Sequence, residues 1–390
     1  MIRAELTIDL DAVRRNVARL EGLATPARYA AVVKANAYGH GLVPVARALE
    51  GRVAAFCVYR VDEAAALRDA HIETPILVLG PIEPSELDGV LAARAAIALW
   101  SEGAFHRDAV RAAERRRTRL AVHAKIETGL SRLGIDPERA THVLTEYLQD
   151  ANLDLHGVYT HLAAAEELES SFTLSQLARF ETALAPLHDV LLERGVIRHA
   201  AASAAAMLYP ALRLDLIRAG IATYGIWPSE ETRASAGEAL ELAPALSWTT
   251  ELVAVRAVEA GSSVGYGCTY HPSRPSRIGV IPIGYAEGLP RSLSNAGVTL
   301  VGGRRVPIVG RICMNMAFVD VTDVPDAVPG NRVTLIGRDG AASIDANEQA
   351  ALAGSIGYEL VTRIPADVPR HYVGDSDGAL VPVASKHGWR

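Results

Sequence analysis

Short apolar segments alternate with amphipathic stretches along the first 230 residues of the chain. EAAALRDA (63–70) and ATHVLTEYLQD (140–150) show the helical spacing of the stretches between the apolar segments. Alternation of strand and helix indicates a parallel sheet, and eight units in a row predict a (β/α)8 barrel rather than an open sheet. The eight expected strands are residues 28–33, 54–58, 75–79, 96–99, 120–125, 155–160, 197–202 and 215–218.

The pattern changes at about residue 240, where the helical periodicity fades. Runs of Val, Ile and Thr then alternate with glycine and proline turns, as in SWTTELVAVRAVEAG, RIGVIPIGYAEG, TLVGGRRVPIVGRIC and RVTLIGRDG. Such runs are typical of short strands in a mostly antiparallel β-domain. We therefore predict a barrel over residues 1–235 and a β-domain over residues 236–390, with the boundary in the charged stretch 228–241.

The overall composition is that of a globular protein. Of the 390 residues, 49% are hydrophobic and 22% are charged, and the net charge of −6 gives no general reason to expect binding to nucleic acid or to an acidic membrane. Three widely separated cysteines predict neither a disulfide framework nor a zinc site, and we expect no metal. The start, MIRAELTIDLDAV, is too charged for a signal peptide, and no apolar run reaches the length of a membrane span. We expect a soluble, cytoplasmic protein.

Polar residues stand at the ends of five of the expected strands. They are Lys34, Lys125, His161, Ser203 and Arg218. In a barrel of this type the active site lies at the C-terminal ends of the strands. Each residue alone could be a solvated or paired member of the rim, but five on one rim indicate a shared site.

The loops after the seventh and eighth strands, SAAAM and AGIATYG, often form a phosphate site in this fold. Ser203 offers a hydroxyl, and Gly220 lets backbone N–H groups approach a phosphate closely. Across the rim, Lys34 ends the apolar run of VVKANAYGHG (32–41), where a buried ammonium is costly unless it is paired or loses its charge. A phosphate beside a lysine amine suggests pyridoxal phosphate, whose aldehyde would convert that amine into an imine.

VVKANAYGHG resembles the cofactor-attachment motif of the alanine racemases. One such motif would be weak evidence, but eight further segments match that family in order and spacing and extend over almost the whole chain. They are HAKIETGLSRLG (123–134), GVYTHLAAAEE (157–167), RHAAASAAA (198–206), LIRAGIATYGIWPS (216–229), VGYGCTY (264–270), IPIGYAEGLPR (281–291), VGRICMNM (309–316) and YELVTRIPADVPR (358–370). The family fold is a barrel followed by a β-domain, in agreement with the pattern.

By this resemblance, Lys34 is the lysine that binds the cofactor, and Lys34 and Tyr266 are the two acid/base groups of a racemase. Two bases on opposite sides of the cofactor are needed because one fixed base cannot easily serve both faces of a planar intermediate. Lys34 would handle the proton of D-alanine and Tyr266 that of L-alanine. Tyr266 would reach the site from the partner subunit of a head-to-tail homodimer with shared active sites. The product D-alanine would supply peptidoglycan synthesis.

The resemblance also implies a relay from Arg218 through His161 to Tyr266. The relay would make the phenol a better base, because its ordinary pKa of about 10 is too high for neutral pH. Arg218 would donate a hydrogen bond to an unprotonated ring nitrogen of the cofactor, which should limit side reactions such as transamination. The alternative for Arg218 is an ion pair with Asp215 or another acid. The cofactor phosphate would be bound by Tyr38, Ser203, the backbone at Gly220 and Ile221, and Tyr358.

Other matched positions concern the substrate. Arg132 and Met314, the latter again from the partner, would engage the substrate carboxylate. Lys125 matches a lysine that is often N-carboxylated in relatives, and a carbamate there would orient Arg132 by a charge-assisted bond. A corridor that favours a methyl side chain over larger ones would be formed by Glu166, Tyr285, Arg291 and Arg311.

The chain departs from the family pattern at three positions. Ala202 stands where relatives often have Asn, so one polar contact near the phosphate is absent. Glu166 replaces a commoner Asp in the corridor, and Asn315 stands where relatives often have Asp. None of the three changes removes a catalytic group.

Three other functions share parts of this pattern. A racemase of serine or another small amino acid is the most serious rival. A pyridoxal-dependent decarboxylase would want an acid at the ring nitrogen, where this chain has Arg218. A non-enzymatic pyridoxal-phosphate carrier built on the barrel alone would not need the β-domain that carries Tyr266.

Overall fold

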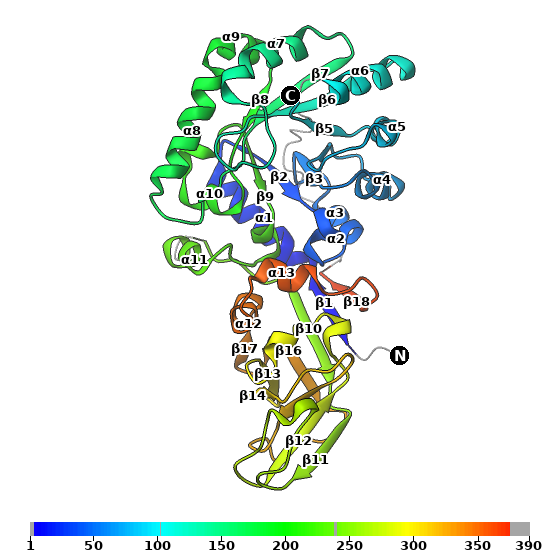
Figure 1. Cartoon of the computed structure of the whole chain (residues 1–390), viewed down its shortest axis with the longest axis vertical. Coiled ribbons are helices and arrows are strands. Elements are labelled where there is room, and N and C mark those ends of the chain that lie inside the picture. Colours follow the sequence, from blue (N-terminus) through cyan, green and yellow to red (C-terminus); the bar gives the residue numbers. More distant parts are fainter. Residues whose placement is uncertain (1–3, 102, 238–239, 375–390) are drawn as a thin grey trace.

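The computed structural model describes residues 4–101, 103–237 and 240–374, and its strands form two sheets (Figure 1). The first sheet has eight parallel strands in the order β8-β7-β6-β5-β4-β3-β2-β9. Its two ends are joined, because Asp215 and Arg218 donate backbone N–H bonds to the carbonyls of Arg198 (3.0 Å) and Ala201 (2.9 Å). The predicted barrel is confirmed, and each expected strand overlaps an observed one. The strands are β2 (Arg28–Val32), β3 (Ala55–Val58), β4 (Ile76–Val78), β5 (Ala96–Leu99), β6 (Leu120–Lys125), β7 (Leu153–Tyr159), β8 (Ile197–His199) and β9 (Leu216–Ala219).

Helices surround the barrel strands (Figure 1). The first of them, α1, buries Val13, Val17 and Leu20 on one face, as its helical spacing predicts, and begins where Asp9 accepts a bond from the N–H of Ala12 (2.9 Å). The barrel helices are α1 (Leu10–Ala24), α2 (Lys34–Tyr38), α3 (Leu42–Leu49), α4 (Val61–Asp69), α5 (Leu87–Ala92), α6 (Ala104–Arg116), α7 (Ala140–Gln149), α8 (Ser171–Leu184), α9 (His188–Glu193), α10 (Ser203–Leu208) and α11 (Glu230–Ala236). Short 3-10 segments are η1 (Pro84–Glu86), η2 (Pro137–Arg139), η3 (Ala185–Leu187), η4 (Pro210–Leu212) and η5 (Ile221–Tyr224).

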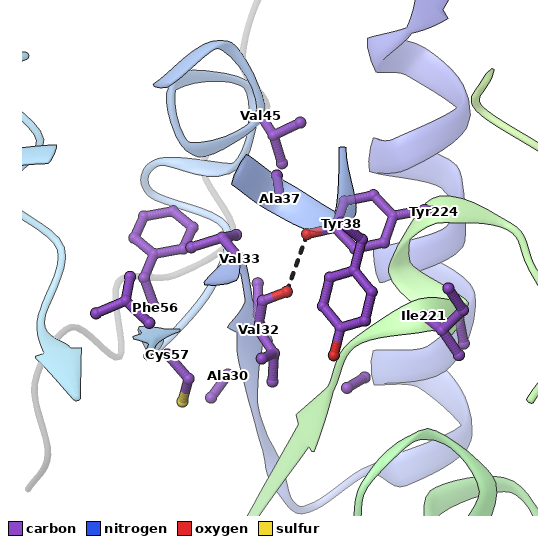
Figure 2. Close-up of a cluster of buried hydrophobic side chains, with 14 of the residues drawn as sticks. Ala30, Val32, Val33, Ala37, Tyr38, Val45, Phe56, Cys57, Ile221 and Tyr224 are labelled. Atoms are coloured by element: carbon purple, nitrogen blue, oxygen red, sulfur yellow. Dashed lines mark hydrogen bonds between the residues drawn. The ribbon is translucent and has the colours of Figure 1, made fainter. Parts of the chain in front are cut away.

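Small and branched side chains pack closely around the end of β2 (Figure 2). Ala30, Val32 and Phe56 are buried there, and the ring of Tyr224 is buried beside them. The hydroxyl of Tyr224 donates to the carbonyl of Val32 (2.9 Å), so its polar atom is satisfied inside the core. This packing fixes the strand end from which Lys34 follows.

The second sheet is mostly antiparallel, as predicted, and has the order β11-β12-β15-β14-β13-β16-β10-β1-β18, with β17 paired to β16. Its strands are β1 (Glu5–Asp9), β10 (Leu246–Glu251), β11 (Ala254–Val258), β12 (Ser276–Ile281), β13 (Val298–Val301), β14 (Arg304–Val309), β15 (Ala317–Asp320), β16 (Arg332–Asp339), β17 (Ala342–Ile344) and β18 (Arg370–Val373). Helices α12 (Ala346–Leu352) and α13 (Gly357–Thr362) and segments η6 (Tyr266–Cys268), η7 (Tyr285–Glu287) and η8 (Arg291–Leu293) complete this part of the chain.

Strand β1 was not expected from the sequence. It pairs antiparallel with β10 and parallel with β18, although it precedes the whole barrel in the chain. Its side chains alternate, with Leu6 and Ile8 buried, but five residues give too short a pattern to identify. The division of the chain at residues 235 and 236 stays a prediction.

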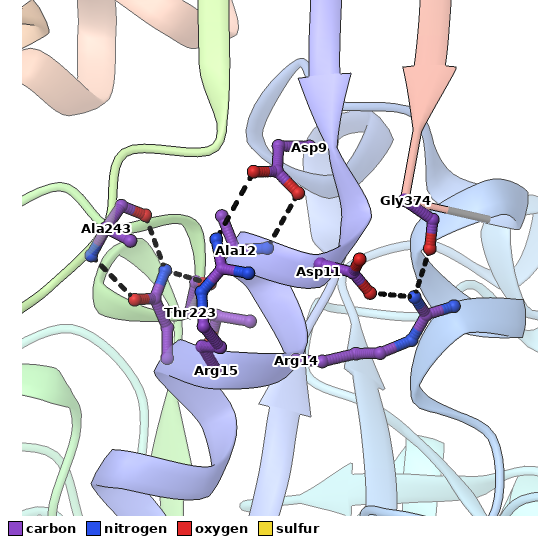
Figure 3. Close-up of polar contacts among 9 residues, drawn as sticks. Asp9, Asp11, Ala12, Arg14, Arg15, Thr223, Ala243 and Gly374 are labelled. Carbon is purple, nitrogen blue, oxygen red and sulfur yellow. Dashed lines mark hydrogen bonds and ion pairs between the residues drawn. The ribbon is translucent and has the colours of Figure 1, made fainter. Parts of the chain in front are cut away.

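Helix α1 holds three distant parts of the chain together (Figure 3). The buried side-chain amide of Asn16 donates to the carbonyls of Ala243 (2.8 Å) and Thr223 (3.2 Å) and accepts from the N–H of Ala243 (2.8 Å). On the same helix, the guanidinium of Arg14 donates to the carbonyl of Gly374 (2.6 Å). The segment that leads into β10 and the last described residue are therefore both tied to the barrel.

The helices of the chain are short or carry charged residues. Within residues 4–101, 103–237 and 240–374, none has both the length and the apolar character needed to cross a membrane.

Candidate active site

A cavity of about 1150 Å³ opens at the C-terminal ends of the barrel strands. Its position agrees with the rule for barrels of this kind. It brings together eleven of the sixteen residues that the sequence predicted for the site. These are Lys34, Tyr38, Lys125, Arg132, His161, Glu166, Ser203, Arg218, Gly220, Ile221 and Tyr358.

Lys34 begins an unusual turn after β2. The next four residues, Ala35 to Tyr38, all have φ of 53° or 54°, in the left-handed region. Residues other than glycine rarely adopt this conformation, and a run of four needs support from its surroundings. The carboxylate of Glu63 supplies part of it by accepting the N–H of Ala35 (2.7 Å) together with those of Tyr59 (2.8 Å) and Arg60 (3.1 Å).

The environment of Lys34 favours its neutral amine. Burial lowers the pKa of Lys34, the positive charge of Arg132 lowers it further, and the negative charge of Glu63 partly opposes both. A neutral amine is the form that attacks an aldehyde, so Lys34 suits the attachment of pyridoxal phosphate.

The loops after β8 and β9 form a site lined by hydroxyl and N–H groups. The sequence placed Lys34 across the rim from this site, but β9 pairs directly with β2, so the loop after β9 lies next to Lys34. The hydroxyl oxygen of Ser203 accepts the backbone N–H of Gly220 (3.0 Å) and of Ala222 (3.4 Å), which leaves its own O–H to act as a donor. A Cβ on Gly220 would lie 2.4 Å from the hydroxyl oxygen of Tyr38, so only glycine allows these groups to approach so closely. The ring of Tyr358 lies 6.2 Å from that of Tyr38. Donors grouped in this way fit a phosphate.

Arg218 is buried at the end of β9. Its Nη1 donates to Nδ1 of His199 (2.6 Å), and its Nη2 donates to the carbonyls of Thr160 (2.9 Å) and Ala200 (3.2 Å). Asp215 does not hold it, because that carboxylate accepts from the backbone N–H (2.7 Å) and the guanidinium (3.3 Å) of Arg198. The ion-pair alternative for Arg218 with Asp215 is therefore wrong. A buried guanidinium that faces the cavity fits an unprotonated ring nitrogen, and the residues present together fit pyridoxal phosphate.

His161 lies just beyond the end of β7 and lines the same cavity. Burial lowers its pKa to about 3, and the nearby charges of Arg218, Arg132, Lys125 and Lys34 contribute in the same direction. The imidazole is therefore neutral at physiological pH, with one nitrogen that donates and one that accepts. The relay from Arg218 through His161 stays a prediction, since the bonds described for Arg218 run to His199 and to two carbonyls.

Lys125 and Arg132 lie on one side of the cavity. Nζ of Lys125 donates to the carbonyl of Leu133, and burial followed by the charge of Arg132 lowers the pKa of Lys125 to about 8. Arg132 follows a tight turn in which the carboxylate of Glu127 accepts the N–H groups of Gly129 (2.6 Å) and Arg132 (3.3 Å). A lysine with so low a pKa has a sizeable neutral fraction, which is what reaction with CO₂ requires.

The other five predicted residues lie on the surface of the β-domain. Tyr266 is 72% exposed and Met314 is 57% exposed, and among the described residues neither lines the barrel cavity. Tyr285, Arg291 and Arg311 are also exposed.

Contacts between loops of the β-domain bring some of these residues together. A Cβ on Gly267, beside Tyr266, would lie 2.7 Å from the guanidinium of Arg311. The carboxylate of Glu287 accepts from the side chain of Asn315 (2.7 Å) and from the N–H of Gly284 (2.8 Å), which joins the loops of Met314 and Tyr285. The structure thus places the predicted residues in two groups within one chain. The prediction that Tyr266 and Met314 reach the site from a partner subunit stays a prediction.

Sequence reasoning missed several residues behind the cavity wall. Glu63 is one, because its contact with the turn after β2 depends on how α4 packs. His199 and His123 are others. They lie in the matched segments RHAAASAAA and HAKIETGLSRLG, in which only Ser203, Lys125 and Arg132 were predicted to belong to the site. Within the described ranges, no group of three or more His, Cys, Asp or Glu is placed to hold a metal ion.

Family models and known proteins match the chain over nearly its full length. Residues 8–228 match the family model "Alanine racemase, N-terminal domain", and residues 245–372 match "Alanine racemase, C-terminal domain". The alanine racemase of Symbiobacterium thermophilum is 41% identical over 370 residues, which cover 95% of this chain and 97% of that protein. The alanine racemase of Carboxydothermus hydrogenoformans is 40% identical over 371 residues, with 94% and 98% covered.

Solved structures agree with these sequence matches. The crystal structure of alanine racemase from D-cycloserine-producing Streptomyces lavendulae has a TM-score of 0.89 and 32% identity, and covers 96% of this chain and 98% of that one. The alanine racemase of Bacillus anthracis with bound L-Ala-P has a TM-score of 0.83 and 34% identity, with 96% of each chain covered.

Proposed function

The chain belongs to the alanine racemase family, and we propose that it interconverts L-alanine and D-alanine with pyridoxal phosphate as its cofactor. The observation that carries the proposal is the composition of the barrel cavity. It joins an amine with a lowered pKa at Lys34, a group of phosphate donors around Gly220 and a buried guanidinium at Arg218. A decarboxylase is not favoured, because arginine rather than an acid faces the place of the ring nitrogen.

When bound, pyridoxal phosphate supplies an electron sink that stabilises negative charge developing on the substrate Cα. The chain's own residues hold and orient it. Lys34 would bind its aldehyde carbon, and the N–H groups of Arg218 would face its ring nitrogen. The phosphate would be bound by Tyr38, Ser203, the backbone at Gly220 and Ile221, and Tyr358.

Racemisation requires a proton to leave one face of Cα and another to arrive on the opposite face. We assign the proton on the D side to Nζ of Lys34 and the proton on the L side to the hydroxyl oxygen of Tyr266. The neutral imidazole of His161 has one donor and one acceptor nitrogen, so it can link Arg218 to Tyr266 by hydrogen bonds without adding a positive charge. Each group then needs to hold or move only one proton.

Tyr266 must come from a second copy of the chain for this arrangement to work. Its side chain is 72% exposed, and it lies in the β-domain, whose other site residues are exposed beside it. Two copies arranged head to tail would each insert this surface into the barrel mouth of the other. The functional unit that we propose is therefore a homodimer with two shared active sites.

The remaining predicted residues would govern the substrate. Arg132 and the partner subunit's Met314 would engage the substrate carboxylate. Carboxylation of the neutral Lys125 amine would create an anion beside Arg132 and orient its guanidinium. A corridor of Glu166, Tyr285, Arg291 and Arg311 would admit a methyl side chain more readily than a larger one.

A chiral assay on purified protein tests the function directly. L-alanine should be converted to a racemic mixture much faster than L-serine or a larger amino acid. Faster turnover of L-serine would make the protein a serine racemase, and failure to racemise any of them with cofactor bound would refute the proposal. We further propose that the protein supplies D-alanine for peptidoglycan synthesis in the cytoplasm.

A mixing experiment tests the shared site. Lys34→Ala and Tyr266→Phe should each be inactive alone, because each removes one of the two bases. Random exchange of subunits makes half of the dimers hybrid, and each hybrid has one intact site, so about a quarter of the wild-type activity should return. No recovery despite verified subunit exchange would contradict the shared site.

A further inference from the structure

Two buried histidines stand in line behind Arg218. Nη1 of Arg218 donates to Nδ1 of His199 at 2.6 Å, and Nε2 of His199 lies 2.9 Å from Nδ1 of His123. Both imidazoles have no exposed surface. Neither histidine has a role in the reaction as described above.

The hydrogen-bond chain determines the tautomer of each imidazole. Arginine can only donate, so Nδ1 of His199 must accept and carry no proton. The proton of neutral His199 is then on Nε2, which makes it the donor to Nδ1 of His123. His123 in turn carries its own proton on Nε2. Burial and the adjacent guanidinium lower the pKa of His199 well below its ordinary value, so its imidazole stays uncharged.

The surrounding strands leave room for this row of hydrogen-bonded side chains. His123 is paired with Gly157 across β6 and β7, at a point where the register of the two strands shifts. A Cβ on Gly157 would lie 2.3 Å from Nδ1 of His123 and 3.1 Å from Nε2 of His199, so the two rings can meet only over a glycine. The ring of Tyr159 stacks on His199 (4.8 Å between centroids, 6° between planes) and lies 5.0 Å from the guanidinium carbon of Arg218.

We propose that His199 and His123 are positioning residues that fix the guanidinium of Arg218 and keep its full positive charge directed at the cofactor ring nitrogen. This inference rests on the proposed function of the cavity. Among the described residues, the bonds to His199, Thr160 and Ala200 occupy three of the five N–H donors of Arg218 and leave two for the cavity side.

A neutral imidazole does something here that a carboxylate could not. A carboxylate at position 199 would also accept the N–H of Arg218, but it would form an ion pair and cancel most of the positive charge. The imidazole accepts the bond and leaves the charge in place. His123 supports this tautomer of His199, because its Nδ1 accepts a hydrogen bond from the Nε2–H of His199.

The first test reads the tautomers directly. Nitrogen-15 NMR of histidine-labelled holoenzyme should show both imidazoles neutral, with an unprotonated Nδ1 and a protonated Nε2. This readout does not depend on racemase activity, so it separates failure of this inference from failure of the proposed function. A protonated Nδ1 on either ring, or a charged imidazole, would overturn the inference.

The second test uses paired substitutions. His199→Phe keeps the ring that stacks on Tyr159 but removes the acceptor, whereas His199→Asn places an amide oxygen near the position of Nδ1. We expect His199→Phe to lower kcat by roughly ten- to a hundred-fold, the effect of one lost hydrogen bond to a charged group, with little change in KM and a shifted visible absorption of the bound cofactor. His199→Asn should recover most of both.

His123→Phe provides a third variant that leaves the His199–Arg218 contact in place but removes the acceptor of the Nε2–H of His199. It should reduce kcat less than His199→Phe, and the double variant should be no worse than His199→Phe alone. A merely structural role would lower the melting temperature in all variants without changing the cofactor spectrum, and that result would overturn the inference. Equal kcat for His199→Phe and His199→Asn would also overturn it, and so would additive losses in the double variant. If His199→Phe does not fold, the NMR result and the other two variants remain decisive.

Discussion

Replacement of Glu63 by glutamine should weaken the turn that presents Lys34. One oxygen of the Glu63 carboxylate accepts from Ala35 (2.7 Å) and the other from Tyr59 (2.8 Å) and Arg60 (3.1 Å). Glutamine has the same shape but only one accepting oxygen. Whichever way the amide is turned, its NH₂ group faces backbone N–H donors on one side.

The size of the effect follows from these contacts. Four consecutive left-handed residues store roughly 1–2 kcal/mol each, so the surroundings must hold about 4–8 kcal/mol of local strain. Loss of a charged acceptor for one or two buried N–H groups costs about 1.5–3 kcal/mol each. We therefore expect Glu63→Gln to lower the free energy of unfolding by about 1.5–6 kcal/mol, and the melting temperature of this 390-residue chain by roughly 2–7 °C.

Thermal unfolding followed by circular dichroism measures the loss of stability, and titration of apoprotein with pyridoxal phosphate measures the effect on the turn. Asp62→Asn is the matched control. It removes one carboxylate from the neighbouring position, but that side chain is 66% exposed and forms a surface ion pair with Arg60, so the melting temperature should stay close to that of the wild type. If Glu63→Gln behaves like Asp62→Asn in both measurements, the carboxylate does not hold the turn.

Three further changes test other parts of the site. Gly220→Ala places a Cβ 2.4 Å from the Tyr38 hydroxyl, so the dissociation constant for pyridoxal phosphate should rise roughly ten-fold or more. The control Gly22→Ala places its Cβ where no atom lies within 4 Å and should leave that constant unchanged, and equal constants for the two variants would refute the argument. The folded pKa of unmodified Lys125 is lowered from 10.5 to about 8, so the unfolded chain binds more protons in that window and the free energy of unfolding should rise with pH across it. Lys125→Met should flatten this rise in urea titrations, and an unchanged slope would count against the lowered pKa. Tyr266→Phe should reduce turnover of L-alanine by about 10²–10⁴ with cofactor affinity unchanged, and normal turnover would exclude it as a base.

The barrel could be predicted because its signals are local. Each strand is a short apolar run beside an amphipathic helix, and the rule that sites lie at C-terminal strand ends then gathers Lys34, Lys125, His161, Ser203 and Arg218 without knowledge of the packing. The structure brings all five to one cavity. Patterning alone gave no reason to group Tyr266 with them, because it lies in the β-domain and outside that cavity, and its proposed role rests on the family resemblance.

What the sequence did not reveal depends on contacts between distant segments. Glu63 acts on a turn 28 residues earlier, and His199 meets His123 across 76 residues. Each of these residues would pass as an ordinary helix or strand residue when its neighbours in sequence are considered alone. Gly157 carried no signal either, because its small size matters only where two side chains from other strands meet in front of it.

The pairing of β1 has a consequence for the order in which the protein folds during synthesis. β1 is made first, but its partners β10 and β18 lie at residues 246–251 and 370–373. All barrel strands end before residue 220, so they can pair while both edges of β1 are still unpaired. The β-domain is therefore completed only when the two extremes of the described chain meet. Loss of residues 5–8 would damage the domain at the far end of the sequence while leaving the Asp9 cap of the barrel helix α1 in place.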